Sequence, residues 1–427
     1  MDLNVTQDKL VIDDLATPRL TEQQRAALDY CATLTVELTP KSILAEARAA
    51  SGLKDPGPGD ALDRLALLCD EWDSDSDLTN LGRLSLRNKL VQHATSRLLL
   101  HDLLKAHPEI HDIKIHRPII VAGLPRSGTT HLLNLMAADS RLRSLPLWES
   151  YEPVPRPTES VEPGELDPRY TRCEQQWQMM QGMSPLLAAM HPMNPDHIHE
   201  ELELMGPDFA SYNYEWLSVS PRWRDHYYHT DQTPHYEYMK TVLKVLTWQD
   251  GDLTGANTRW VLKCPQHLEQ LPVLHRVFPD AFIAVTHRDP VSVIQSAITM
   301  LAYGQRTSRT HVDLPAILNY WSDRVEHLLR ACVDDRNKLP SGQSLDVLFH
   351  EFMADDLGTV EAIYQRAGLP MTDTAQGQLQ QYLRDNPRGK HGQVVYRLQQ
   401  DFGVDPVALR ERFQFYFDQF PVRAEVR

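Results

Sequence analysis

The sequence predicts an α/β protein in which a mostly parallel sheet is flanked by helices and preceded by a helical N-terminal region. Three observations support this class: short β-branched runs recur from residue 119 onward, a glycine-containing loop follows the first run, and long segments separate the runs. Such spacing leaves room for helical crossovers between parallel strands. The 427 residues, 42% of them hydrophobic, suffice for one large domain with an accessory region.

Residues 1–115 are predicted to form the helical N-terminal region. Thr21 and Gln24 have the spacing of a capping box at a helix start. Proline and glycine at 55–59 break the helical pattern once. Leu62, Leu65 and Leu68 then recur at helical spacing, and a further apolar face runs through Leu90, Val91, Ala94, Leu98 and Leu104. The sequence assigns no role to this region.

Residues 116–427 are predicted to form the main domain. Its first strand is 119–122, a short β-branched run typical of a buried parallel strand. Further strands are expected at 260–262, 281–286 and 345–349, each separated by enough chain for a crossover.

An insertion at about 151–255 is predicted to carry a lid or a wall of the substrate site, because prolines open it and Met, Trp, Tyr and His are frequent within it. Its large side chains either line an adaptable apolar pocket or belong to the core. They are Met179, Met180, Met183, Met190, Met193, Met205, Tyr212, Tyr214, Trp216 and Trp223.

Charge and cysteine content exclude several classes of protein. The net charge of −15 argues against a general nucleic-acid surface. The five cysteines are scattered without a CxxC pair, which argues against a zinc or redox centre and fits a reducing compartment. The first residues do not resemble a secretory leader, and no apolar run approaches the roughly 18 residues of a membrane span. We therefore expect a cytoplasmic protein.

The loop from Gly123 to Thr130 follows the first strand and precedes an apolar helical stretch. Its Gly-x-x-x-x-Gly-Thr-Thr spacing matches the Walker phosphate loop, so the sheet is expected to be P-loop-like. Thr129 stands where the Walker motif needs lysine, and Arg126 offers a cation within the loop instead. An ordinary strand-turn-helix joint is the alternative interpretation.

Pro125-Arg126-Ser127-Gly128-Thr129-Thr130 resembles the 5′-phosphosulfate loop of the sulfotransferases that use 3′-phosphoadenosine 5′-phosphosulfate (PAPS), most closely the bacterial branch with arginine in the loop. Two later motifs occur in the order of that family. Arg288 and Ser296 resemble its pair for the 3′-phosphate, and the segment Arg388-Gly389-Lys390-His391-Gly392 resembles its basic glycine loop over the same phosphate.

The resemblance implies PAPS as sulfuryl donor and no metal. The residues that it implies for donor binding are Pro125, Arg126, Ser127, Gly128, Thr129, Thr130, His131, Arg288, Ser296, Arg388, Gly389 and Lys390. Taken singly, Arg288 could also be a strand-end arginine paired with Asp289, and Arg388 with Lys390 a solvated basic turn.

The segment from Leu262 to His267 occupies the place of the Lys-Thr-His motif of the animal cytosolic enzymes. This resemblance implies that Lys263 stabilises the leaving oxygen with help from Arg126. Pro265 fills the position of their basic histidine and cannot accept a proton. Glu149, placed similarly to the glutamate base of the protein-tyrosine sulfotransferases, is the first candidate for the base. The second candidates are His267, Glu200 and Glu201.

The predicted activity is transfer of a sulfuryl group from PAPS to a hydroxyl of a hydrophobic small molecule or lipid. The alternatives are a small-molecule kinase that uses ATP, against which the missing Walker lysine counts, and a nucleotide-binding protein without transfer activity, suggested by Pro265. The expected partner is the acceptor alcohol rather than nucleic acid, and a homo-oligomer is left open. The sequence does not identify the acceptor.

Overall fold

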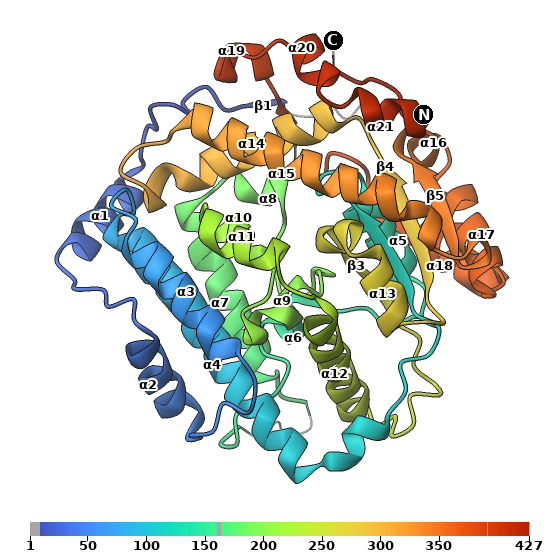
Figure 1. The fold of residues 1–427 in the computed structure, drawn as a ribbon, viewed down its shortest axis with the longest axis horizontal. Helices are drawn as coiled ribbons and strands as arrows, with labels where there is room; N and C mark the ends of the chain where they lie inside the picture. Colours follow the sequence, from blue (N-terminus) through green and yellow to red (C-terminus); the bar gives the residue numbers. More distant parts are fainter. Residues whose placement is uncertain (1–8, 160–163, 391, 427) are drawn as a thin grey trace.

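A computed structural model describes residues 9–159, 164–390 and 392–426. Its centre is a four-stranded parallel sheet in the order β3-β2-β4-β5 (Figure 1). The strands are β2 (Ile119–Gly123), β3 (Val261–Cys264), β4 (Phe282–His287) and β5 (Ser344–Leu348). All four predicted strands are therefore present, and the expected α/β class is confirmed.

Helices cover both faces of this sheet. Side chains of β2 alternate between two apolar cores, with Ile119 and Val121 in one and Ile120 and Ala122 in the other, as the strand period of two requires. One face packs on α5 (Thr129–Ala137) and α17 (Asp356–Ala367). The other face packs on four helices: α12 (Thr233–Gln249), α13 (Leu271–Val277), α14 (Pro290–Ser308) and α15 (Leu314–Asp335).

The N-terminal residues form four helices before the sheet begins. They are α1 (Glu22–Ala32), α2 (Pro40–Ser51), α3 (Ala61–Asp73) and α4 (Asn80–Ala106). The predicted capping box at Thr21 is present, and residues 55–59 separate α2 from α3 as expected. Apolar side chains of α2, α3 and α4 share a core with Phe209, Tyr214 and Trp223 of the insertion.

A short parallel pair was not expected from the sequence. β1 (Lys9–Val11) pairs with β6 (Gln393–Val395), so the region predicted to be helical also contains a strand. Three-residue strands carry too few residues for a periodicity to be recognised.

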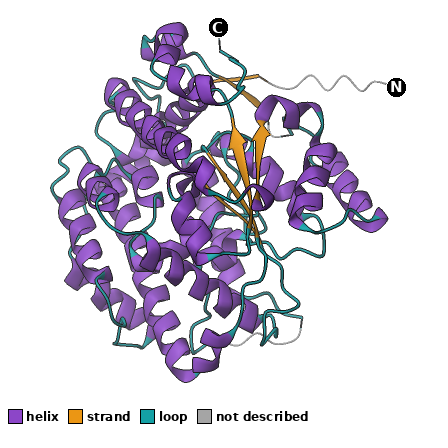
Figure 2. Ribbon diagram, turned by 45° about the vertical axis from the view of Figure 1, so that its right-hand side comes forward, coloured by secondary structure: helices purple, strands orange, loops and turns teal. Residues whose placement is uncertain are grey.

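The insertion is helical, as the purple ribbons of Figure 2 show around the few central strands. It comprises α7 (Pro168–Met183), α8 (Leu187–Met190), α9 (Leu202–Met205), α10 (Asn213–Leu217), α11 (Pro221–Tyr228) and α12, after the short α6 (Leu147–Tyr151). The chain then ends in α16 (Phe349–Ala354), α17, α18 (Asp373–Asp385), α19 (Leu398–Phe402), α20 (Pro406–Glu411) and α21 (Gln414–Gln419).

No helix among the described residues combines the length and apolarity that a membrane crossing requires.

Candidate active site

A cavity of about 1390 Å³ opens beside the carboxyl ends of the parallel strands. Ligands of open parallel sheets bind at this edge because the loops that follow the strands gather there. Twelve of the predicted catalytic and donor-binding residues line it: Pro125, Arg126, Gly128, Thr129, Thr130, His131, Glu200, Lys263, Arg288, Ser296, Arg388 and Gly389. The structure thus brings the three separate motifs to one cavity.

The phosphate loop leads from β2 into α5. Gly128 has φ +83° and caps the helix, a backbone conformation that glycine adopts without strain. A Cβ at Gly123 would lie 1.9 Å from Oγ1 of Thr286, so β4 also requires glycine there. Ser127 is buried and fixes the loop, with its Oγ donating to Leu124 O (2.6 Å) and lying 2.9 Å from Oγ1 of Thr286.

Arg126 carries the cation of the loop into the cavity. Its φ of +65° is uncommon for a residue with a Cβ. Nε donates to Oγ of Ser296 (2.9 Å) and Nη1 donates to Met190 O (2.6 Å). Ser296 in turn donates to the hydroxyl of Tyr396 (2.9 Å). Side-chain hydrogen bonds therefore join the loop to the first turns of α14.

Arg288 follows β4, as its motif predicted. Nε and Nη2 donate to the two carboxylate oxygens of Glu425 at 2.8 and 2.7 Å. Nη1 donates to the carbonyl of Arg126 (2.6 Å), and the guanidinium lies 3.8 Å from the ring centre of Phe349. The two arginines that the resemblance assigns to opposite ends of the donor are thus in contact through the loop backbone.

Arg388 and His131 meet at Asp356 on the same side of the cavity. Arg388 Nη2 donates to Oδ1 of Asp356 (2.6 Å), and His131 Nε2 lies 3.1 Å from that oxygen. Lys390 does not line the cavity, because its Nζ donates instead to Asp385 O (3.1 Å) and to Oδ1 of Asn386 (3.3 Å). His391 of this motif lies outside the described residues.

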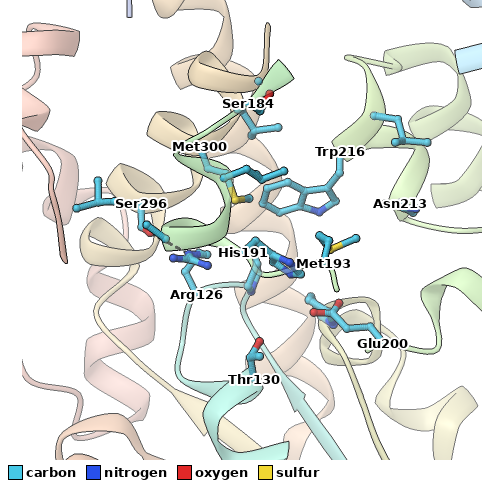
Figure 3. A pocket seen from close by; sticks show the side chains of 18 of the residues that line it. Arg126, Thr130, Ser184, His191, Met193, Glu200, Asn213, Trp216, Ser296 and Met300 are labelled. Atoms are coloured by element: carbon cyan, nitrogen blue, oxygen red, sulfur yellow. Dashed lines mark hydrogen bonds between the residues drawn. The ribbon is translucent and has the colours of Figure 1, made fainter. Parts of the chain in front are cut away.

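Lys263 lies at the end of β3 and is buried. Its Nζ forms an ion pair with Oε1 of Glu200 and donates to Oγ1 of Thr130 (3.2 Å). An ammonium, a carboxylate and a phosphate-loop hydroxyl are therefore adjacent. In Figure 3, Arg126 and Ser296 lie to the left of His191, Glu200, Met193 and Trp216 lie to its right, and Thr130 lies below it.

Glu149, the first candidate for the base, does not line the cavity. Its carboxylate pairs with Arg143 at 2.7 Å, and burial raises its pKa against the opposing effect of that arginine. The sequence assigned Glu149 to the site because it follows the phosphate-loop helix at a suitable distance along the chain. In the structure, α6 places its carboxylate beside Arg143 instead. The structure brings Glu200 rather than Glu149 beside Lys263.

Glu201 and His267 form a buried pair apart from the cavity. His267 lies on the 3₁₀ turn Pro265–Glu269, where Nε2 is 3.0 Å from Oε1 of Glu201 and Nδ1 is 2.9 Å from the hydroxyl of Tyr236. Glu201 also accepts the backbone N–H of Lys263 (2.8 Å). This arrangement fixes the end of β3 and leaves neither group directed at the cavity.

Three imidazoles form a cluster with ring centres 5.5–5.9 Å apart, and two of them, His191 and His199, line the cavity, while the third is His197. Burial lowers the pKa of His197 to about 4 and that of His199 to about 3, and it places the pKa of His191 well below the ordinary value. The rings are therefore neutral at pH 7. Within the described part of the chain, no group of three or more His, Cys, Asp or Glu residues is arranged to hold a metal ion.

The far end of the cavity is largely apolar. Its walls include Met179, Met180, Met183, Leu187, Met193, Trp216, Val219, Met300, Leu301 and Trp321. The methionine-rich cluster of the insertion is therefore divided, because Met190, Met205, Tyr212, Tyr214 and Trp223 are buried in the cores instead. Both interpretations of that cluster hold for different members.

Sequence reasoning missed Tyr396 and Glu425, both of which line the cavity. Glu425 is 137 residues from Arg288 along the chain, and Tyr396 is 100 residues from Ser296. Neither lies in a motif, so only the folded chain identifies them.

Comparisons with known proteins agree with this geometry. A family model described as "Sulfotransferase family" matches residues 118–373. Among solved structures, the sulfotransferase STF1 from Mycobacterium tuberculosis H37Rv is 30% identical with a TM-score of 0.76, and the match covers 89% of this chain and 99% of that one. The sulfotransferase STF9 from Mycobacterium avium is 25% identical with a TM-score of 0.80, covering 91% and 98%.

No curated protein sequence matches the chain. The family match spans more than half of the residues, including the phosphate loop, Lys263, Arg288 and Ser296. The chain therefore belongs to the sulfotransferase family and is an enzyme of that class.

Proposed function

We propose that this sulfotransferase takes its sulfuryl group from PAPS and transfers it to a hydroxyl of a hydrophobic small molecule or lipid. One observation carries the proposal: cations from three distant segments line one end of a cavity, methionines and Trp216 form an apolar wall at the other end, and Lys263 and Glu200 lie between the two. A nucleotide with two separate anionic groups suits the first end and an apolar alcohol suits the second.

The donor end offers a group for each phosphate of PAPS. Backbone N–H groups at the start of α5, with Arg126 and Thr130, suit the 5′-phosphosulfate. Arg288 and Ser296 suit the 3′-phosphate, with Arg388 and Gly389 facing the same end. Gly123 and Gly128, whose Cβ positions would collide with Thr286 and Phe349, let the loop pack closely against β4 and α16.

Glu200 is the base in this proposal, and Lys263 stabilises the leaving group. The carboxylate of Glu200 accepts the proton of the acceptor hydroxyl, whose oxygen forms a bond to sulfur. The bond from sulfur to the 5′-phosphate oxygen breaks, and the ammonium of Lys263 stabilises the negative charge that develops on that oxygen. Their ion pair holds both groups beside Thr130 of the phosphate loop.

The acceptor end combines two parts of the chain. The insertion contributes the methionines of α7 with Trp216, and the N-terminal region contributes one face of α4 through Leu81, Ser85, Asn88, Lys89 and Gln92. We therefore assign residues 1–115 a role in shaping the acceptor site. The five cysteines are free and buried, which supports a cytoplasmic location.

Calorimetry with 3′-phosphoadenosine 5′-phosphate (PAP) tests the donor. We expect binding that Arg288→Ala weakens at least about tenfold, because a charge-assisted pair with phosphate is lost. Absence of binding, or binding that Arg288→Ala leaves unchanged, would overturn the donor assignment. Mass spectrometry of lipophilic alcohols incubated with PAPS and the enzyme then identifies the acceptor. Products sulfated only on hydrophilic alcohols would contradict the apolar assignment.

A further inference from the structure

The carboxylate of Glu425 occupies the anion-binding side of Arg288. Both of its oxygens accept hydrogen bonds from the guanidinium, at 2.8 and 2.7 Å, and Oε2 lies 3.4 Å from Oγ of Ser292. A bidentate pair of this kind is the same arrangement that arginine makes with phosphate. Glu425 and Arg288 both line the donor end of the cavity.

Glu425 is held at this position by its own backbone. Its N–H donates to Oδ2 of Asp289 (2.8 Å), and the N–H of Val426 points to the same oxygen (3.4 Å). Asp289 is fully buried and also caps α14 through the N–H of Val291 (3.0 Å). Arg410 of α20 adds an ion pair to Asp289 at 3.2 Å. The C-terminal segment is therefore anchored at the residue next to Arg288, and α20 and α21 lie near the end of β4 (Figure 1).

We propose that Glu425 substitutes for the 3′-phosphate on Arg288, and that the donor nucleotide displaces this carboxylate when it binds. The inference rests on the proposed function, since it takes Arg288 as the 3′-phosphate ligand. Arg288 has one bidentate edge toward Glu425, while its third nitrogen is committed to the carbonyl of Arg126. A phosphate and the carboxylate cannot both use that edge.

Because the carboxylate of Glu425 competes for Arg288, it lowers the affinity of the protein for every nucleotide that carries a 3′-phosphate. Donor and spent nucleotide share that group, so both are weakened equally. A nucleotide without a 3′-phosphate does not need the edge and leaves the pair intact. Glu425 therefore reduces the contribution of the 3′-phosphate to the affinity for the nucleotide.

Calorimetry on the full chain with Glu425→Gln tests this inference. The amide keeps the size of the side chain and removes its charge, so we expect PAP to bind about tenfold more tightly. Adenosine 5′-monophosphate, which lacks the 3′-phosphate, should bind with unchanged affinity. Glu411→Gln is the matched control, because it removes the same charge from an exposed position on α20 and should change neither affinity.

The double variant Arg288→Ala/Glu425→Gln adds a second measurement. Once Arg288 is gone, we expect Glu425→Gln to give no further gain in PAP affinity, since coupled residues are not additive. If Glu425→Gln binds PAP as weakly as the unaltered protein or more weakly, Glu425 orients Arg288 and the inference is wrong. An equal gain for adenosine 5′-monophosphate would also overturn it. If PAP binds to none of the proteins, the proposed donor fails and the inference with it.

Discussion

Glu200 and Lys263 form an ion pair that lines the cavity. Removing two charges from water costs free energy, so an ion pair at this depth indicates a functional role rather than a contribution to stability. Their position between the cationic and apolar ends suits proton acceptance and charge stabilisation at the reacting atoms. Glu149 also carries a carboxylate, but that carboxylate forms an ion pair with Arg143.

We expect Glu200→Gln to lower kcat by about 10²–10⁴-fold while PAP affinity changes little, because a general base contributes to the chemical step. Glu149→Gln is the matched control and should leave kcat within a few-fold. Steady-state kinetics and calorimetry measure both. Loss of activity in Glu149→Gln with retention in Glu200→Gln would restore the first candidate.

The neutral histidines give the fold a pH dependence of definite sign. Burial lowers the pKa of His199 to about 3, whereas the unfolded chain titrates near 6.5. Between these values the unfolded state binds more protons, so stability is complete above pH 6.5 and falls as the pH drops through that range. Urea unfolding at pH 7 and pH 5 measures this effect. Between these pH values, the free energy of unfolding should fall by about 2 kcal/mol less in His199→Gln than in the unaltered protein. Equal losses would show that His199 is protonated in the folded state.

Among the elements, the phosphate loop depends on one backbone conformation. Gly128 has φ +83°, and a Cβ there would lie 2.9 Å from the ring of Phe349. We expect Gly128→Ala to lower the free energy of unfolding by about 1–3 kcal/mol and to weaken PAP at least about tenfold, because the loop must shift.

Gly52→Ala is the control for the conformational cost alone. Gly52 has φ +73° with nothing within 4 Å of the added Cβ. The free energy of unfolding of Gly52→Ala should be about 1 kcal/mol lower, and its affinity for PAP should not change. If Gly128→Ala behaved in the same way, the contact with Phe349 would not constrain the loop.

The elements also show what the sequence could predict. β2, the phosphate loop and α5 are determined by residues within 119–137, so their pattern is readable, and β4 is likewise a fully buried run with several β-branched residues. β3 and β5 include Lys263 and Asp346 among their apolar residues, so their pattern is weaker. β1 and β6 are three residues each and exist through their pairing with each other. Likewise, Glu201 precedes Lys263 by 62 residues, and only folding shows that its carboxylate serves the backbone at the end of β3 rather than the cavity.

On the scale of the whole molecule, the site is assembled from segments spread along nearly the full chain. Residues of α4 line the acceptor end, and the β1–β6 pair follows directly after the Arg388–Gly392 segment at the donor end. That pairing restricts the basic loop, since one of its flanks is fixed against residues 9–11.

Leu10→Pro tests this connection by removing a backbone N–H from β1. We expect PAP affinity to fall several-fold while the main unfolding transition persists, because the four-stranded sheet does not include β1. Val11→Thr keeps the backbone donor at an exposed position of the same strand and should bind PAP normally. Calorimetry with thermal unfolding checks both, and unchanged PAP binding in Leu10→Pro would show that the pair does not support the loop.

The β1–β6 pair has a consequence for biosynthesis. The two strands of this pair are translated some 380 residues apart, which at cellular rates of translation is about 20–80 seconds. During that interval the Leu10 strand has an unpaired edge, a condition that favours association with other chains. β1 therefore stays open to other partners during synthesis, and the donor site is completed only after residues 393–395 emerge.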